Sequence, residues 1–465
     1  MSYTNTMRTV LLFIPHYTYT SDLLHTKYIT ALAEQYRVVA LSPVFANASP
    51  GKYPHHPNLI YRPWHILRPR LRNFWTKNIR VPFIREFNHL AYYRQRGYAF
   101  KSLRRKMLRA IGRVLPALLV RTDFITRVEQ FFTPRSKEFR ALLNEYRPAL
   151  ILTCTPGLSD LEAEAILLAR KEKISTVAIN FSWDNLTTNA PQIRKTDYLV
   201  SWNHVIRREA ETLHRYPPER VFVSGIMRFD HHFQPETHPP LEAARARSVP
   251  LPLTGREDFL RSKGLDPAKK TLLFTTVPQH TYPRQPEDVR AILNLIKDGR
   301  LPSLNLFIRL HPGDLREKYA EFENVPGVHI EFGGKIAAAA GGKHKIEMTE
   351  EDYANLRHSL RYADSNVNFC SSITLEAVIY DTPVINLALG GWRYIYDRDH
   401  YAPIIKYNAV RMAENEEELC TAIKAYLADP ALDREGRARV FDDYVVFRDG
   451  KAYQRNADFL KDIIN

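Results

Sequence analysis

The sequence NVNFCSSITLEAVIYDTPVINL, residues 366–387, packs several structural signals into one short stretch. NVNF has the length of a strand, a Ser-Ser turn follows, and TLEAVIYD has helical character. Pro383 stops that helix before VINL begins another strand. The order strand, polar turn, helix, strand predicts an α/β fold, in which ligands bind at the carboxyl ends of the strands.

The polar turn of this stretch is a candidate phosphate site. Backbone N–H groups at the start of the helix lack partners within the helix and carry partial positive charge. Ser371, Ser372 and Thr374 add hydroxyls. Glu376 lies one turn into the helix, where its carboxylate could accept from ribose hydroxyls. The alternative is an ordinary N-cap, because Ser372 is a good cap residue in any helix.

A second stretch, LNLFIRLHPGD at residues 304–314, carries a related signal. Arg309 and His311 lie two residues apart at the end of a buried-looking strand, so they project to the same side. Arginine offers a charged fork to a phosphate, and histidine offers a hydrogen bond or a proton. We therefore expect two neighbouring strand ends to hold the phosphate of a nucleotide.

With these two motifs the chain resembles bacterial transferases of the GT-B fold. The similar families are surface-polysaccharide glycosyltransferases with His-Pro and Ser-Ser motifs, including sialyl- and Kdo-transferases, teichoic-acid glycerophosphotransferases, and the non-hydrolysing UDP-sugar 2-epimerases. The resemblance implies that His311 and the serines contact the donor phosphate and that Glu376 contacts the ribose. It rests on Arg309, His311, Pro312, Ser371, Ser372, Thr374 and Glu376.

The resemblance implies an α/β protein of the GT-B class, with two Rossmann-like domains that face each other across a cleft. The start of the chain agrees, since TVLLFIP, a helical segment and RVVALS read as a βαβ unit. We expect an N-terminal acceptor domain at 1–230, a linker at 231–266, a nucleotide-sugar domain at 267–430, and C-terminal helices at 431–465 that could cross back.

Three further residues are candidates because each follows a predicted strand. His16 follows the first strand, and His280 lies in the first loop of the second domain. Asp184 lies in SWDNLTT after the strand at 176–181, where it could take a proton from an acceptor hydroxyl while Trp183 stacks on a sugar. The alternative for that cluster is an Asx-turn with a buried tryptophan.

We expect neither a metal nor another cofactor. The three cysteines are scattered, without metal-ligand spacing, and His231, His232 and His238 lack the helical or strand context of a metal site. No apolar run reaches the length of a membrane span, and the first residues lack a signal-peptide pattern. These features predict a cytoplasmic protein.

The charge of the chain is localised. The net charge is +15, and residues 62–140 hold 20 Lys and Arg against 4 Asp and Glu, which leaves −1 elsewhere. Aromatic residues are interleaved with the arginines, and residues 100–120 fit an amphipathic helix. This basic insertion could pack on its own domain or dock on the anionic inner face of a membrane, beside a lipid-linked acceptor. Nucleic acid ranks lowest because no nucleic-acid-binding motif is present.

The favoured function is a metal-independent glycosyltransferase that uses a nucleotide-sugar donor and a cell-surface polysaccharide or lipid-linked acceptor. A glycerophosphotransferase using CDP-glycerol would need the same phosphate site. A 2-epimerase would need its own acid/base carboxylates near the sugar. A non-catalytic nucleic-acid-binding protein would owe its affinity to residues 62–140 and bind with a steep salt dependence.

Overall fold

The computed structural model describes residues 7–47, 51–65, 131, 136–188, 195–233, 255–337 and 345–464. Most of the basic insertion, including the helix expected at 100–120, lies outside these ranges, and so does its expected membrane contact. The chain forms two compact units, each described by itself below. Unit 1 comprises Met1–Arg228, Arg398–His400 and Lys451–Asn465, and unit 2 comprises Phe229–Asp397 and Tyr401–Gly450.

Among the described residues, no helix combines the length and the apolar character that a membrane crossing needs.

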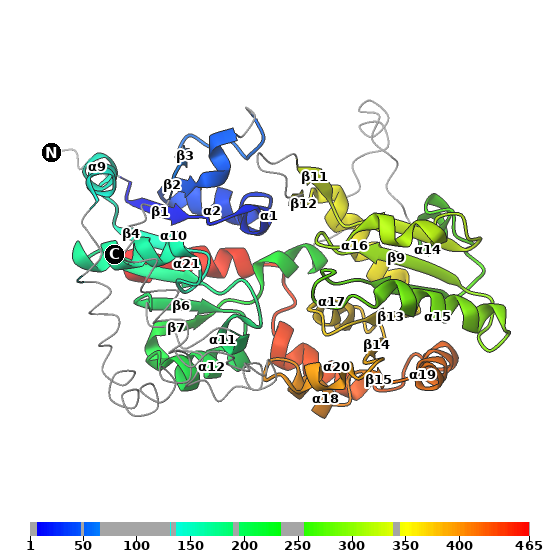
Figure 1. Ribbon diagram of the computed structural model, residues 1–465. Coiled ribbons are helices and arrows are strands. Elements are labelled where there is room, and N and C mark those ends of the chain that lie inside the picture. The colour runs from blue at the N-terminus through cyan, green and yellow to red at the C-terminus, as the bar shows by residue number, and fades with distance from the viewer. Residues whose placement is uncertain are drawn as a thin grey trace, which may run out of the picture. The chain divides into compact units, whose positions relative to one another are not determined.

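Unit 1 contains a seven-stranded parallel sheet in the order β3-β2-β1-β4-β5-β6-β7 (Figure 1). Strand order therefore reverses between β1 and β4, which is the Rossmann arrangement with its switch point at these two strands. The strands are β1 (Thr9–Phe13), β2 (Arg37–Ser42), β3 (Leu59–Pro63), β4 (Leu150–Thr153), β5 (Ser175–Ile179), β6 (Tyr198–Ser201) and β7 (Val221–Val223).

Helices cover both faces of this sheet. The helical segment expected between the first two strands is two helices, because Thr26 caps the second one and its hydroxyl accepts from the N–H of Tyr28 at 3.3 Å. Within the described ranges, the helices of unit 1 are α1 (Tyr17–Leu24), α2 (Lys27–Gln35), α9 (Lys137–Tyr146), α10 (Asp160–Lys171), α11 (Asn185–Thr188), α12 (His204–His214) and α21 (Ala452–Ile464).

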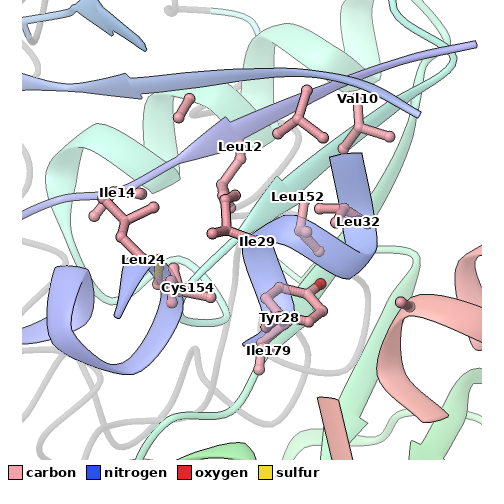
Figure 2. Packing of buried hydrophobic residues seen from close by; sticks show 14 of the residues in the cluster. Val10, Leu12, Ile14, Leu24, Tyr28, Ile29, Leu32, Leu152, Cys154 and Ile179 are labelled. Atoms are coloured by element: carbon pink, nitrogen blue, oxygen red, sulfur yellow. The ribbon is translucent and has the colours of Figure 1, made fainter. Parts of the chain in front are cut away.

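The core of unit 1 forms on both sides of β1 because side chains alternate along a strand. Val10 and Leu12 face α2 and α21, as the close-up in Figure 2 shows for the α2 side. Leu11 and Phe13 face α9 and α10. The C-terminal helix α21 is therefore an integral part of the first sheet's core.

Unit 2 contains a six-stranded parallel sheet in the order β10-β9-β8-β13-β14-β15. Numbered from its own first strand, this is again the Rossmann order, with the switch point between β8 and β13. The predicted α/β class with two Rossmann-like sheets is confirmed. The strands are β8 (Thr271–Thr275), β9 (Asn305–Leu310), β10 (Val328–Phe332), β13 (Ser365–Asn368), β14 (Val384–Leu387) and β15 (Arg411–Ala413).

The remaining elements of unit 2 surround this sheet (Figure 1). A two-stranded antiparallel pair, β11 with β12, lies apart from it. The bounds are α14 (Arg256–Ser262), α15 (Gln285–Lys297), β11 (Lys335–Ala337), β12 (Lys345–Glu347), α16 (Glu350–Tyr362), α17 (Ile373–Ile379), α18 (Ala402–Lys406), α19 (Glu416–Ala428) and α20 (Arg434–Val440), with shorter helical turns at Met227–Phe233, Arg316–Phe322, Trp392–Asp397 and Phe441–Val445.

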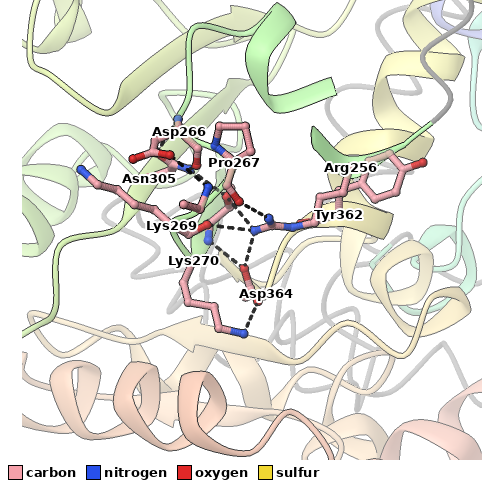
Figure 3. Close-up of polar contacts among 10 residues, drawn as sticks. Arg256, Asp266, Pro267, Lys269, Lys270, Asn305, Tyr362 and Asp364 are labelled. Carbon is pink, nitrogen blue, oxygen red and sulfur yellow. Dashed lines mark hydrogen bonds and ion pairs between the residues drawn. The ribbon is translucent and has the colours of Figure 1, made fainter. Parts of the chain in front are cut away.

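The amino-terminal edge of the second sheet is fastened by Arg256 of α14, which lies inside the range expected to be a linker. Its guanidinium donates to the carbonyls of Pro267 and Lys269 at 2.8 and 3.0 Å (Figure 3). It also reaches the carboxylate of Asp364 at 3.1 Å, which accepts from the N–H of Thr271 at 2.8 Å. One side chain thus joins α14 to the starts of β8 and β13, so the opposite, carboxyl edge is left for binding.

Candidate functional site

The Ser-Ser turn follows β13 and rests on buried asparagines of that strand. Asn366 donates to the carbonyl of Leu273 and to the hydroxyl of Thr275 on β8, both at 3.1 Å. Asn368 donates to the side-chain oxygen of Asn366 at 2.7 Å. Both asparagines are completely buried. The polar side of NVNF is therefore a hydrogen-bonded brace across the switch point.

The turn itself is sharp. Cys370 has φ +42°, and its N–H donates to the hydroxyl of Tyr396 at 3.1 Å. Ser371 and Ser372 come next and are half-buried at the carboxyl edge, and α17 begins at Ile373. The two serine hydroxyls thus lie where the sequence predicted a phosphate to bind. The first N–H groups of α17 are already used within the turn, because those of Thr374 and Leu375 donate to the carbonyls of Ser371 and Ser372 at 3.1 and 3.0 Å, and that of Ile373 donates to the Ser371 hydroxyl at 3.4 Å.

Thr374 lies beneath the turn rather than on its surface. Its hydroxyl is completely buried and lies 2.9 Å from that of Tyr401. Tyr401 in turn exchanges hydrogen bonds with Asn386 of β14 at 2.8 and 2.7 Å. The hydroxyl of Thr374 is thus part of the brace that fixes the turn.

His311 is held in one tautomer. Its Nδ1 accepts from the N–H of Gly313 at 2.8 Å, which leaves the ring proton on Nε2. Its own N–H donates to the hydroxyl of Thr276 at 2.8 Å. Burial, with a smaller contribution from His280, lowers the pKa of His311 to about 4. At neutral pH His311 is therefore a neutral Nε2–H donor.

Arg309 is buried, and its guanidinium forms an ion pair with Glu331 of β10. Burial lowers the pKa of Arg309, whereas the neighbouring carboxylates oppose that effect. Burial alone would raise the pKa of Glu331, but the hydrogen bond from His329 and the charges of Arg309 and Lys263 outweigh it and hold this pKa at about 2. The Arg309 charge is thus neutralised within the sheet.

The expectation that the two strand ends are neighbours is wrong, because β8 lies between β9 and β13. Two strand spacings put their ends about 10 Å apart. The loop after β8 contains His280, which is exposed and close enough to His311 to lower its pKa. The edge therefore presents three consecutive loops, with His311, His280 and the Ser-Ser turn in that order.

Glu376 lies beside His231 and His232, two histidines that were not expected to form a metal site. Nε2 of His232 lies 3.1 Å from the Glu376 carboxylate, and Nδ1 lies 2.8 Å from the Tyr380 hydroxyl. The ring of His231 lies 3.9 Å from that of His232. Ligand-type atoms of His231, His232 and Glu376 all lie within 4.8 Å of one another, so among the described residues this cluster could hold a metal ion.

The first sheet has its own polar edge. His16 is exposed after β1, and its ring lies 4.6 Å from that of Tyr19. The ring of Tyr19 lies 5.6 Å from that of Phe181, just before the predicted cluster at Asp184. The loops that hold His16 and Asp184 are thus joined by one aromatic contact chain.

Asp184 is half-buried and accepts hydrogen bonds from Ser182 and, at 3.3 Å, from Thr188. Trp183 is buried, with its ring 5.1 Å from that of His400. The alternative of a turn with a buried tryptophan therefore describes Trp183, whereas the carboxylate of Asp184 lies nearer the surface.

Two carboxyl groups of this edge were not predicted as site residues. Glu209 of α12 has a buried Oε2 that finds no hydrogen-bond partner among the described residues. Burial raises the pKa of Glu209 to about 8, with contributions from the charges of Asp399 and Asp184. Helical spacing alone gives no sign of this, because Glu209 resembles any polar residue on an amphipathic helix.

Ser159 and Glu162 have the spacing of a capping box, in which the glutamate carboxylate would accept from the N–H of Ser159. Instead the Glu162 carboxylate turns back to accept from the N–H of Thr155 at 2.7 Å and from the hydroxyls of Thr155 and Ser159. Burial raises the pKa of Glu162 to about 7, against these hydrogen bonds. Unit 1 therefore holds two carboxyl groups whose pKa values burial raises, and the charge of Asp184 adds to this effect at Glu209.

The sequence also contains one Asp-x-Asp triplet, Asp397-Arg398-Asp399, a pattern that can bind metal-nucleotide complexes. Asp397 belongs to unit 2, and its carboxylate accepts from Arg393 at 3.3 Å. Asp399 belongs to unit 1, and its negative charge acts to raise the pKa values of Glu209 and His400. These two carboxylates therefore have different surroundings.

No protein-family model and no curated protein sequence matches the chain. Solved structures do match. UDP-GlcNAc 2-epimerase from Neisseria meningitidis, bound to UDP-GlcNAc, has 12% identity and a TM-score of 0.53, covering 98% of this chain and 100% of that one. The S. aureus MnaA complex with UDP has 11% identity and a TM-score of 0.54, covering 98% and 96%.

A variant of the wall teichoic acid polymerase TagF has 11% identity and a TM-score of 0.50, covering 98% of this chain and 89% of that one. Identities this low establish the fold alone. Together with the two parallel sheets in Rossmann order, they establish that this chain has the GT-B fold.

Proposed function

We propose that the protein is a glycosyltransferase that takes a sugar from a nucleotide-sugar donor and passes it to a cell-surface glycan or lipid-linked acceptor without a metal. The observation that carries this proposal is the carboxyl edge of the second sheet. There a neutral His311 with its proton on Nε2 lies in the same row of loops as the braced Ser371-Ser372 turn. The structures of similar fold include proteins solved with UDP or UDP-GlcNAc, which supports a nucleotide ligand.

In this proposal the second sheet stabilises the leaving nucleotide. As the glycosidic bond breaks, negative charge grows on the phosphate, and fixed donors aimed at that charge lower the barrier. His311 Nε2–H and the hydroxyls of Ser371 and Ser372 are these donors. Arg309 acts from a distance by holding β9 against β10, since its charge is already paired with Glu331. Glu376, fixed by His232, accepts from the ribose.

Asp184 is assigned to the acceptor. Its carboxylate is the group of unit 1 that takes the proton of the attacking hydroxyl, and His16 is the alternative base at the same sheet edge. The short side chains of Ser182 and Thr188 orient the Asp184 carboxylate. The acceptor class rests on the resemblance of the two phosphate motifs to surface-polysaccharide enzymes.

A UDP-sugar 2-epimerase is the second candidate, and a specific observation favours it. An epimerase needs an acid and a base near the sugar, and Glu162 and Glu209 supply carboxyls with raised pKa values on the same edge as Asp184. Two of the structures of similar fold are an epimerase with UDP-GlcNAc and a UDP complex. A glycerophosphotransferase remains the alternative with the same phosphate site.

One experiment separates these functions. UDP-, CMP-, GDP- and CDP-linked sugars and CDP-glycerol are screened by thermal shift, and the stabilising donor is followed by NMR with and without acceptor oligosaccharides. Sugar transfer that requires an acceptor supports the glycosyltransferase. Inversion at C2 of the sugar without acceptor supports the epimerase, and transfer of glycerol phosphate supports the glycerophosphotransferase. A shift with none of the donors contradicts all three.

The same assay tests the metal-free mechanism. After treatment with EDTA, turnover is expected to persist. Loss of turnover that Zn²⁺ or Mn²⁺ restores would contradict it and direct attention to His231, His232 and Glu376 or to the Asp397–Asp399 triplet.

A further inference from the structure

A hollow of unit 1 lies at the amino edge of the first sheet, opposite the carboxyl edge that holds Asp184. It surrounds the amino ends of β5 and β6 and the carboxyl ends of α10 and α12, and has a volume of about 620 Å³. That volume is in the range of small-molecule sites, roughly 300–1,000 Å³. The charged side chains that line this basic basin are Arg170, Lys173, Lys195, Asp197, Arg215 and Arg220.

The basic basin is strongly positive because five cations line it against one carboxylate, that of Asp197. Asp197 accepts from the N–H of Thr176 at 2.9 Å and from the hydroxyl of Thr176 at 2.8 Å. Five cations therefore surround a hollow in which one carboxylate is turned to the backbone. Such a concentration of like charge lowers stability unless an anion binds there.

The cations are held in place by neutral groups. Arg170 donates to the carbonyl of Lys195 at 2.6 Å, and Lys195 donates to the carbonyl of Arg215 at 3.2 Å. Arg220 lies 4.4 Å from the ring centre of Tyr198. Within the described ranges no carboxylate forms an ion pair with Arg170, Lys173, Arg215 or Arg220, which distinguishes them from Arg290, Arg309 and Arg437 in unit 2.

The backbone supplies an independent observation. Lys173 and Arg215 have φ values of +58° and +55°, just past the ends of α10 and α12. Glycine is the usual residue at this left-handed position, because other side chains cost energy there. A favourable contact of basic residues with the helix carboxyl ends explains part of this choice. It does not explain Arg220, which is the last residue of the 3-10 turn Pro218–Arg220 and lines the same hollow.

We propose that the basic basin binds a ligand through its phosphate groups, at a site separate from the nucleotide edge of the second sheet. Arginine and lysine are the residues that bind phosphate oxygens by charge-assisted hydrogen bonds. The phosphate could belong to a soluble ester or to the headgroup of an anionic lipid. The proposal does not depend on which sugar nucleotide the enzyme uses.

The test removes two cations without straining the fold. In the double variant Lys173→Gly, Arg215→Gly, glycine suits both left-handed positions, so the melting temperature is expected to stay the same or rise. The control, Lys318→Gln with Lys424→Gln, removes the same charge from exposed positions of unit 2. Hydrogen–deuterium exchange of the full chain is followed with added pyrophosphate, and sedimentation with phosphatidylcholine vesicles with and without phosphatidylglycerol.

We expect pyrophosphate to protect peptides around residues 170–176 and 213–220 if the ligand is a soluble phosphate ester. This protection should be at least about tenfold weaker in the glycine variant than in the control. No protection by pyrophosphate, but phosphatidylglycerol-dependent sedimentation that weakens in the glycine variant alone, assigns a lipid headgroup. Neither effect, or equal effects in variant and control, overturns the proposal. Exchange at residues 311–313 and 370–375 reports the nucleotide edge separately.

Discussion

His311 illustrates how one backbone contact decides the chemistry of a side chain. The N–H of Gly313 occupies Nδ1, and burial keeps the ring neutral, so only Nε2–H is left to donate. A ligand phosphate then meets a fixed neutral donor whose state does not change between about pH 5 and 8, because the pKa lies near 4.

His311→Ala and Ser372→Ala are each expected to lower turnover by about a hundredfold or more, because each removes a donor aimed at the leaving phosphate. Ser303→Ala is the control, since Ser303 is exposed at the amino end of β9. The measurement is kcat with the donor identified by thermal shift, with circular dichroism to check the fold. Near-normal turnover in both variants would show that the phosphate binds elsewhere.

Glu209 provides a test of the unit 1 edge through stability. Its pKa of about 8 in the folded chain lies above the unfolded value of about 4.3, so the folded state holds the proton more tightly. The stability that this proton contributes is complete below about pH 4.3 and is lost as the pH rises through about 8.

Glu209→Gln cannot ionise and escapes that loss. The melting temperature of the variant minus that of the wild type is therefore expected to grow between about pH 5 and pH 8, by about 2 °C or more, and to level off above. Glu211→Gln on the same helix is the control, because Glu211 only pairs with Arg207 near the surface. A difference that is flat with pH would mean that Glu209 ionises normally.

At the scale of elements, the sequence predicted most strands of the two sheets but missed two strands at the sheet edges. Strands such as 9–13, 37–42 and 305–310 were predictable because buried parallel strands read as largely apolar runs. β3 and β15 were missed. Both lie at sheet edges, where the side chains of LIYRP are at most half-buried and RMA has three residues with one buried.

The candidate site was predictable in part for the same reason. The sequence shows directly where a strand is followed by a polar turn, and this pattern predicted that His311, Ser371 and Ser372 lie at a sheet edge. Which hydroxyls face solvent cannot be seen, and Thr374 lies buried under the turn. The ion pair between Arg309 and Glu331 forms because β9 pairs with β10, and the local sequence does not specify which strands pair.

Helix α20 tests the packing of the elements behind the site. A Cβ added to Gly436 would lie 2.3 Å from the carbonyl oxygen of Tyr407 and 2.5 Å from that of Asn408. Gly436→Ala is therefore expected to cost about 1–3 kcal/mol in the free energy of unfolding, because backbone cannot give way as a side chain can. At Gly255, which starts α14, an added Cβ meets nothing within 4 Å.

Urea unfolding of Gly436→Ala beside Gly255→Ala measures this difference. Equal stability of the two variants would mean that α20 packs more loosely against residues 407–408 than described.

At the scale of the whole molecule, the last helix belongs to the first sheet. Leu460 of α21 is completely buried in the cluster that contains Leu12 and Tyr28, and the Tyr28 hydroxyl donates to Asn456 at 3.0 Å. Unit 1 is thus completed only when the end of the chain is present, so its stability depends on contacts far apart in sequence.

Leu460→Ala is expected to destabilise the chain by about 2–5 kcal/mol, the usual cost of emptying a buried leucine site. Lys461→Ala, one residue later and exposed, serves as the control and should change the free energy of unfolding by less than about 0.5 kcal/mol. Denaturant unfolding checks both, and equal effects would contradict the assignment of α21 to this core.

The most direct test of the account is a crystal structure of the chain with UDP. The account predicts the diphosphate at the carboxyl edge of the second sheet, with phosphate oxygens within hydrogen-bond distance of Nε2 of His311 and of the Ser371-Ser372 turn. A nucleotide bound elsewhere, with His311 and Ser372 contacting only protein, would contradict it.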